Sequence, residues 1–326
     1  MRRRDFIGIV GSAATWPVAA QAQRPAVRIG FLYSGAANSF VALARSRAIR
    51  EGLRDNGLID GRDYTIEARF AAGHYERFPE LAKELAQAGV SVIFANTIAS
   101  VRAAQLLVPP LPIVMLPIND PVGAGLIASL ARPGGYTTGL ASLNEDLTLK
   151  MLEYERAIVP KATLLAALFN PANPSNPKFV DQLRSRASAF GVSVRPVALQ
   201  SLDGLDAAFA TIMEHSPDAL QVIADSGLLD LSDRIAALAL ANRLPSFASS
   251  PIYAECGGLL AYGFSSTNFY ARAGYYVKRI LDGANPGDLP VEQPTRIELW
   301  INLKTGKALG LNIPMNIQEL ADQVIE

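Results

Sequence analysis

The chain has 326 residues, 50% of them hydrophobic, with 30 basic and 30 acidic side chains. This composition is typical of a globular α/β protein, and the length is enough to bury the cores of two modest domains. A near-neutral chain lacks the electrostatic footprint of proteins that bind nucleic acid or anionic membranes, so we expect neither partner.

The first 22 residues have the layout of a secretory signal peptide. A basic head at Arg2–Arg4 is followed by a short apolar stretch and the small-x-small sequence Ala20-Gln21-Ala22. The apolar stretch is shorter than the ~20 residues that a membrane-spanning helix needs. Cleavage after Ala22 removes three arginines and one aspartate, which leaves 27 basic and 29 acidic residues and a formal charge of −2. We therefore predict a soluble mature protein in the periplasm.

The signal resembles the twin-arginine export signal of bacteria, because Arg3-Arg4 precede Asp5-Phe6-Ile7. An ordinary Sec signal with a basic head is the alternative. On the twin-arginine route, replacing both Arg3 and Arg4 with lysine blocks export and leaves the precursor in the cytoplasm, which cell fractionation and immunoblotting would detect. Normal export of the double variant would assign the protein to the Sec route.

Downstream of the signal, short apolar runs alternate with amphipathic helical segments. Residues 78, 81, 82 and 85, for example, are apolar at the spacing of one helical face, with Gly89 after the last turn. Strands that alternate with helices in this way predict βαβ units and a parallel sheet. The predicted strands of the first half lie at 27–33, 64–70, 90–95 and 112–116, and its helices at about 38–56, 78–88 and 99–107.

The same pattern starts again after a segment rich in turn-forming residues at 132–139. The predicted strands of the second half lie at 163–169, 192–199, 219–224 and 259–262, and its helices at about 178–190, 205–212 and 269–280. The halves join near residues 142–144, and a Pro-rich stretch at 286–294 indicates that the chain passes between them more than once. We therefore predict two doubly wound α/β lobes that close on a ligand like a clamshell.

Short polar side chains follow most of the predicted strands. Ligands of open parallel sheets bind beyond the C-terminal ends of the strands, so these residues are candidates for a binding site. The candidates are Ser34, Asn96, Thr97, Asn119 and Asp120 in the first half, and Asn170, Asn173 and Asp225 in the second, with Tyr262 at a crossing between lobes. Each one could instead cap a helix or form a turn. As a set they favour a small polar or zwitterionic ligand.

The residue types suggest how such a ligand is held. Asp225 suits an ammonium group, whereas Ser34, Asn96 and Thr97, with backbone N–H groups at helix starts, suit a carboxylate. Aromatic neighbours such as Tyr33 and Tyr262 offer surface for a side chain. Three prolines in residues 170–177 stiffen the loop after one strand, as a wall of the site or as a capped turn. We therefore expect an amino acid or similar small carboxylate, aromatic or branched and apolar.

Motifs for catalysis and for cofactors are missing from the sequence. Neither His74 nor His215 follows a predicted strand, so a Ser-His-Asp triad has no base, which argues against an exported hydrolase. No Cys/His cluster has the spacing of a zinc site, and no G-x-S-x-G or Walker-type sequence occurs. Cys256 is the single cysteine, which excludes an intramolecular disulfide. We expect no catalytic residue, no metal and no cofactor.

Several segments resemble the substrate-binding proteins of bacterial ABC transporters, in the subgroup that includes tryptophan- and tyrosine-binding members. The similarity extends over essentially the whole mature chain. The matching segments are Ile29–Gly35, Asn119–Val122, Ala128–Gly135, Asn170–Pro174, Leu289-Pro290 and, the most specific of them, Ile301–Leu311.

The resemblance implies a periplasmic-binding-protein clamshell of type I, with three crossings between the lobes and no enzymatic activity. Lobe 1 would comprise residues 27–142 and about 263–290, and lobe 2 residues 143–262 and about 291–326. The ligand-binding positions that it implies are Ser34, Asn96, Thr97, Asp120, Asn144, Asn170 and Asp225. The implied partner is an inner-membrane ABC permease, and the implied state is a monomer. A periplasmic sensing module is the alternative that the sequence leaves open.

Overall fold

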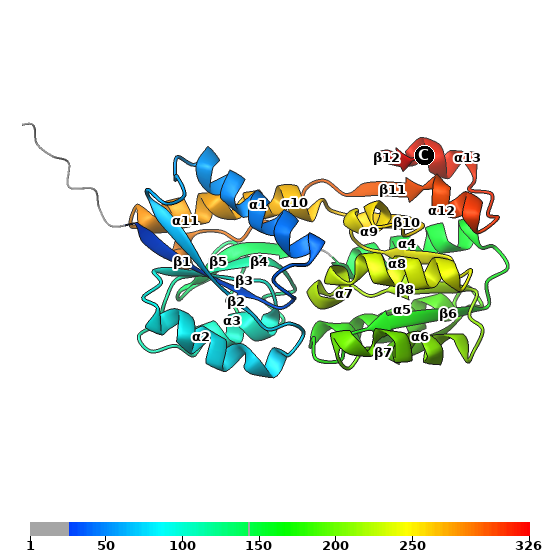
Figure 1. The fold of residues 1–326 in the computed structure, drawn as a ribbon, viewed down its shortest axis with the longest axis horizontal. Helices are drawn as coiled ribbons and strands as arrows, with labels where there is room; N and C mark the ends of the chain where they lie inside the picture. Colours follow the sequence, from blue (N-terminus) through cyan, green and yellow to red (C-terminus); the bar gives the residue numbers. More distant parts are fainter. Residues whose placement is uncertain (1–25, 143) are drawn as a thin grey trace, which may run out of the picture.

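The structure, a computed structural model, describes residues 26–142 and 144–326, so the predicted signal peptide lies outside the described residues. Two lobes lie side by side, each built around one β-sheet with helices on both faces (Figure 1). We call the five-stranded sheet and its helices lobe 1, and the seven-stranded sheet and its helices lobe 2. The predicted fold class, two doubly wound α/β lobes, is confirmed.

Lobe 1 has a fully parallel sheet. In spatial order its strands are β2 (Tyr64–Phe70), β1 (Val27–Tyr33), β3 (Val92–Ala95), β4 (Ile113–Asn119) and β5 (Thr137–Ser142). One face is covered by α1 (Phe40–Asp55), α10 (Ser266–Ala271) and α11 (Ala273–Leu281), and the other by α2 (Phe78–Gln87) and α3 (Ile98–Gln105) (Figure 1). Two short 3-10 helices, η1 (Tyr75–Arg77) and η3 (Pro286–Asp288), lie in its connections.

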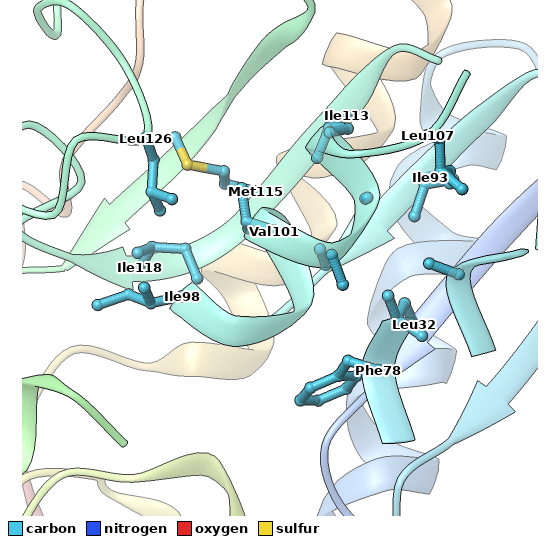
Figure 2. Close-up of a cluster of buried hydrophobic side chains, with 14 of the residues drawn as sticks. Leu32, Phe78, Ile93, Ile98, Val101, Leu107, Ile113, Met115, Ile118 and Leu126 are labelled. Carbon is cyan, nitrogen blue, oxygen red and sulfur yellow. The ribbon is translucent and has the colours of Figure 1, made fainter. Parts of the chain in front are cut away.

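Side-chain alternation along the strands explains why this sheet needs helices on both faces. Phe31 and Tyr33 of β1 pack with α1, α10 and α11, whereas Leu32 between them packs with α2 and α3. Figure 2 shows the cluster of buried side chains around Leu32, to which α2 contributes Phe78 and α3 contributes Val101. Each such side chain contributes about 1.5–3 kcal/mol when fully buried. Burial on both faces is the reason that the inner strands β3 and β4 of this sheet are mostly apolar.

Lobe 2 has a mixed sheet. In spatial order its strands are β12 (Gln323–Ile325), β11 (Glu298–Asn302), β10 (Leu260–Gly263), β9 (Ser246–Ala248), β8 (Ala219–Val222), β6 (Leu164–Phe169) and β7 (Ser193–Ala198). The pair β10 and β11 is antiparallel, and the other neighbours are parallel. One face is covered by α4 (Asn144–Ile158), α5 (Ser175–Ser188) and α13 (Met315–Leu320), and the other by α6 (Leu205–Met213), α7 (Ser226–Asp230), α8 (Ser232–Ala241) and α9 (Ile252–Glu255). The helix α12 (Leu303–Ala308) and the 3-10 helix η2 (Leu202–Gly204) complete the lobe.

The chain passes between the lobes three times: after β5, after β10 and before β11. The second passage returns it to lobe 1, where α10 and α11 pack on α1. Two glycines permit this close approach. A Cβ on Gly52 would lie 1.8 Å from the carbonyl oxygen of Ala271, and one on Gly274 would lie 2.3 Å from the carbonyl carbon of Gly52. Three connecting segments between two otherwise separate cores are the arrangement of a hinge.

Two segments differ from the sequence prediction. The sequence indicated a segment rich in turn-forming residues at 132–139, but its last three residues begin the buried strand β5, which extends over residues 137–142. Its backbone is fitted to its neighbours, since Thr138 Oγ1 donates to the carbonyl of Leu289 at 2.7 Å and Gly139 adopts a φ of +125° against β4. The predicted helix at 269–280 is instead two helices, α10 and α11, on either side of Arg272. The strand β5 consists mostly of small residues and has no apolar pattern of its own. Its pairing with β4 defines it, so the sequence alone did not predict it.

Candidate functional site

A cavity of about 100 Å³ lies between the lobes. Lobe 1 contributes residues at the ends of β3 and β4 and side chains of α1 and α10, and lobe 2 contributes residues that follow β6, β8 and β9. One buried water needs about 10–15 Å³, so a small organic molecule fits here. Apolar and aromatic side chains such as Ile118, Leu229, Phe264 and Tyr270 line it beside the polar groups.

Asn96 lines the cavity, and Ser34 stands behind it. The backbone N–H of Ser34 donates to Asn96 Oδ1 at 3.0 Å, and Asn96 Nδ2 donates to Ser34 Oγ at 2.9 Å. Both residues are buried, and they follow the neighbouring strands β1 and β3. Ser34 therefore fixes the orientation of the Asn96 amide and is not itself a lining residue.

Thr97 also lines the cavity and caps α3. Its hydroxyl accepts from the backbone N–H of Ser100 at 3.1 Å, while Ser100 Oγ accepts from the backbone N–H of Thr97 at 3.0 Å. This reciprocal capping box satisfies two N–H groups that a helix start would otherwise leave unpaired. The sequence offered ligand contact and helix capping as alternatives for Thr97. The position of this residue is compatible with both roles.

Asp225 lines the cavity, but the protein already supplies hydrogen-bond donors to both of its carboxylate oxygens. The donors are Gly227 N (2.8 Å), Leu228 N (3.0 Å) and Asn170 Nδ2 (3.2 Å) on Oδ1, and Asn173 Nδ2 (2.8 Å) and Tyr75 OH (3.1 Å) on Oδ2. A carboxylate offers about four lone-pair positions, so five donors saturate it. Asp225 therefore caps α7 and joins lobe 2 to Tyr75 of lobe 1.

The Asn-Pro loop after β6 holds two of these donors. Asn170 is tied on both sides, because its backbone N–H donates to Asn176 Oδ1 at 2.9 Å and its own Oδ1 accepts from Ala172 N at 2.9 Å. Asn173 Oδ1 accepts from Ser175 N at 3.1 Å. Asn173 lines the cavity, whereas Asn170 lies behind Asp225. The loop is therefore a fixed wall of the cavity, held by hydrogen bonds to the first two residues of α5.

Arg45 lines the cavity and was not predicted from the sequence. It sits in the buried stripe of α1, four residues from both Val41 and Ile49, and is only 4% exposed. Its Nη1 donates to Tyr33 OH at 2.9 Å, and its guanidinium lies 4.8 Å from the ring centroid of Tyr270. An arginine inside an apolar helical stripe is the sequence signal that could have identified it.

Tyr33 connects Arg45 to lobe 2. Its hydroxyl accepts from Arg45 and donates to Asp230 Oδ1 of α7 at 2.9 Å. Burial raises the pKa of the Tyr33 hydroxyl, which keeps the donor protonated. Burial also raises the pKa of the Asp230 carboxyl, to about 6, against the lowering effect of Arg45. Tyr33, for which the sequence suggested contact with a ligand side chain, is instead fully buried behind Arg45.

Asn119, at the end of β4, also lines the cavity, whereas Asp120 and Tyr262 are not among its lining residues. Asp120 is exposed at the rim, where its Oδ1 accepts from Gly123 N at 2.9 Å and its Oδ2 lies 3.7 Å from Lys178 Nζ of α5. Tyr262 on β10 is half-buried and packs against Tyr154 with 5.2 Å between ring centroids. Asn144 begins α4, and its side chain lies outside the described part of the chain.

Contacts across the cleft show that the lobes are closed. Tyr75 reaches Asp225, Tyr33 reaches Asp230, and Lys178 approaches Asp120. The fit is tight at Gly35, where a Cβ would lie 1.3 Å from Asp230 Oδ2. In Figure 1, α7 lies where the lobes meet, next to α1, which it contacts. Closure therefore depends on one short helix of lobe 2 meeting the ends of β1 and α1.

Within residues 26–142 and 144–326, no group of three or more His, Cys, Asp and Glu side chains is placed to hold a metal ion. Over the same residues, no helix combines the length and the apolar character that crossing a bilayer requires. His74 is exposed, with Nδ1 3.2 Å from Glu76 Oε1, and does not line the cavity. Arg45, Asp225 and aromatic hydroxyls are the ionisable groups of the described cavity lining.

A family model described as ABC transporter substrate binding protein matches residues 41–325. A tyrosine-binding protein of Clostridioides difficile strain R20291 is 26% identical over 262 residues, which cover 80% of this chain and 75% of that protein. The crystal structure of an ABC domain from Streptococcus pneumonia in complex with L-Trp has a TM-score of 0.81 at 24% identity, and the match covers 92% of this chain and 100% of that chain.

An open, ligand-free structure offers a contrast. This substrate-binding protein from Clostridium difficile, described as having adhesive properties, is 25% identical, and the match covers 92% of this chain and 99% of that chain. Its TM-score is 0.61, well below that of the L-Trp complex at the same coverage. The overall fold of the present structure is therefore more similar to that of the complex than to that of the open structure.

Proposed function

Because the chain belongs to the ABC transporter substrate-binding protein family, as its sequence resemblance predicted, we propose that it binds a small carboxylate between its lobes and delivers it to an inner-membrane ABC permease. The observation that carries the proposal is the cavity, whose walls come from both lobes at the C-terminal ends of strands. The fold is that of type I periplasmic binding proteins, in which closure encloses the ligand. This architecture supports binding rather than catalysis.

The relatives suggest the ligand class. One is named a tyrosine-binding protein, and another was crystallised with L-Trp. Phe264 and Tyr270 give the cavity an aromatic surface, and Asn96 and Thr97 place polar groups beside it. Small carboxylates with an aromatic or branched apolar part, amino acids among them, therefore fit the site. We propose that Asn96, Thr97 and Asp225 line the bound ligand, with Ser34 and Asn170 supporting them.

The site of action follows from the proposed export. Residues 1–22 carry the signal-peptide pattern, so we propose that the mature protein begins at Gln23 and works as a monomer in the periplasm. Mass spectrometry of the small molecule released when the purified mature protein is denatured tests the proposed function. A small organic carboxylate is expected, and a released molecule without a carboxyl group would contradict the proposal.

Ligand-linked closure gives a second test. Small-angle scattering should report a smaller radius of gyration with ligand than without, because a ligand that contacts both lobes favours the closed form. In Gly35→Ala the new Cβ meets Asp230 Oδ2, so the closed form is disfavoured and ligand should no longer reduce the radius of gyration. Gly204→Ala is the control, since its Cβ would lie 3.4 Å from Ser201 Oγ on the surface of lobe 2. Ligand-induced compaction of Gly35→Ala equal to that of Gly204→Ala would contradict this closure.

A further inference from the structure

Arg45 is a buried cation whose guanidinium group is only partly hydrogen-bonded by the described residues. Of its guanidinium nitrogens, Nη1 donates to Tyr33 OH, whereas Nε is buried without a hydrogen-bond partner among the residues that the structure describes. Across residues 26–142 and 144–326, Arg45 has no ion pair with a carboxylate within 4.0 Å. Its closest link to a negative charge is indirect, from Tyr33 OH to Asp230 Oδ1. A buried charge without a direct counterion is costly, so a site that keeps one is suited to an anionic ligand.

Ser250 adds a second unsatisfied group to the same cavity. It follows β9 in lobe 2 and lines the cavity, and its buried Oγ has no hydrogen-bond partner within the described part of the chain. Arg45 belongs to lobe 1, so the two unpartnered polar groups come from opposite walls. A carboxylate between them would accept hydrogen bonds from both lobes, and this is the kind of contact that favours closure.

Asp225 does not offer the complementary group. It is the carboxylate of the described cavity lining, and its two oxygens already accept five hydrogen bonds from the protein. An ammonium group would have to displace one of these donors, whereas a carboxylate at Arg45 would displace none. The described lining therefore holds an incompletely paired cation and no unpaired carboxylate, since Asp230, whose Oδ2 is unpartnered among the described residues, is not one of its members.

From these contacts we infer that the natural ligand is an organic acid without an amino group, with its carboxylate on Arg45 and Ser250 and its apolar part against Phe264 and Tyr270. This inference rests on the proposed function and narrows it. It separates the chain from relatives whose names indicate amino acids. Arg45 is thus assigned as the residue that selects net negative charge.

Matched pairs of ligands test the charge preference in the wild-type mature protein. The pairs are 3-phenylpropionate with phenylalanine, indole-3-propionate with tryptophan, 3-(4-hydroxyphenyl)propionate with tyrosine, and 4-methylpentanoate with leucine. The protein is refolded free of bound ligand and titrated calorimetrically with each compound. In the pair that contains the tightest-binding compound, we expect the amine-free acid to bind at least about tenfold more tightly than the amino acid. Tighter binding of the amino acid in that pair would overturn the inference and leave the proposed function standing.

Variants test the role of Arg45. Arg45→Met should weaken binding of the amine-free acid by about ten- to a hundredfold, the range of one charged hydrogen bond. Arg102→Met is the control, since Arg102 is exposed and donates to the carbonyl of Ala124 outside the cavity. A folded Arg45→Met variant with wild-type affinity would overturn the assignment. If that variant does not fold, Ser250→Ala, for which we expect weaker acid binding, and the wild-type pairs decide.

Different results would contradict the proposed function and the assignment of the ligand's carboxylate. If no member of any pair binds and the co-purified molecule has no carboxyl group, the proposed function fails, and the inference fails with it. If acids bind but neither Arg45→Met nor Ser250→Ala weakens them, only the assignment of the carboxylate position fails.

Discussion

Asp225→Asn is expected to destabilise lobe 2 in the absence of any ligand. An asparagine retains one acceptor oxygen for the N–H groups of Gly227 and Leu228 but presents an NH₂ group to the Asn173 amide and the Tyr75 hydroxyl. The Asn173 amide then faces a second donor, and the Tyr75 hydroxyl loses its charged acceptor. Because hydrogen bonds to a charged group contribute about 1.5–3 kcal/mol, and leaving a buried partner unsatisfied costs a similar amount, we expect the free energy of unfolding to fall by about 2–4 kcal/mol.

Urea denaturation of ligand-free protein measures this effect, with Asp206→Asn as the matched control. Asp206 is exposed in the first turn of α6, so its substitution should change the free energy of unfolding by less than about 0.5 kcal/mol. Ligand binding to Asp225→Asn should also weaken, because the link to Tyr75 favours the closed lobes. Unchanged stability with a selective loss of amine-containing ligands would instead indicate a direct contact between Asp225 and an ammonium group.

The second large effect is a pH dependence from Glu155. This residue of α4 is 4% exposed, and no described residue forms a hydrogen bond with either of its carboxyl oxygens. Burial raises the pKa of the Glu155 carboxyl from 4.5 to about 8. Between these values the folded protein holds a proton that the unfolded chain has released. Stability is therefore fully present below pH 4.5 and is lost as the pH rises toward 8, by up to about 1.4 kcal/mol per pH unit.

Glu155→Gln should remove this slope, because glutamine keeps the shape of the protonated acid and does not ionise. Its advantage over wild type in urea denaturation should therefore grow from pH 5 to pH 8. Glu153→Gln is the control, since Glu153 is exposed on the same helix and pairs with Lys150. If the difference between Glu155→Gln and wild type were constant across this range, Glu155 would not ionise in that window.

Several residues that the sequence proposed for a ligand site lie together at the cavity. Asn96, Thr97 and Asp225 line the cavity, and Asn119 and Asn173 lie there as well. Local sequence was enough for these residues, because each follows a strand whose C-terminal end is readable from a short apolar run. Ser34 and Asn170 follow strands too, but their side chains bond to other predicted residues and stand behind them. Position at a strand end therefore identifies the neighbourhood of a site and not the direction of each side chain.

Arg45 and Ser250 were missed for different reasons. Arg45 lies in the middle of α1, so the strand-end rule does not reach it, and its charge becomes notable only once the burial of that helix face is known. Ser250 follows the three-residue strand β9, which is too short to leave a pattern in the sequence. The position of Tyr262 depends on its ring contact with Tyr154. This contact joins β10 to α4, which are far apart in the sequence.

The sequence by itself was enough to determine the alternation of strands and helices, the two α/β halves and the family. It also predicts an export signal. These features depend on composition and on apolar spacing over a few residues, where local preference and burial agree. Tertiary structure alone decided that residues 137–142 are a strand, that α10 and α11 pack on α1, and which groups of the cavity keep unused hydrogen-bonding capacity. The reason is physical: whether Asp225 is saturated and Arg45 is not depends on donors and acceptors brought together from distant segments and from both lobes.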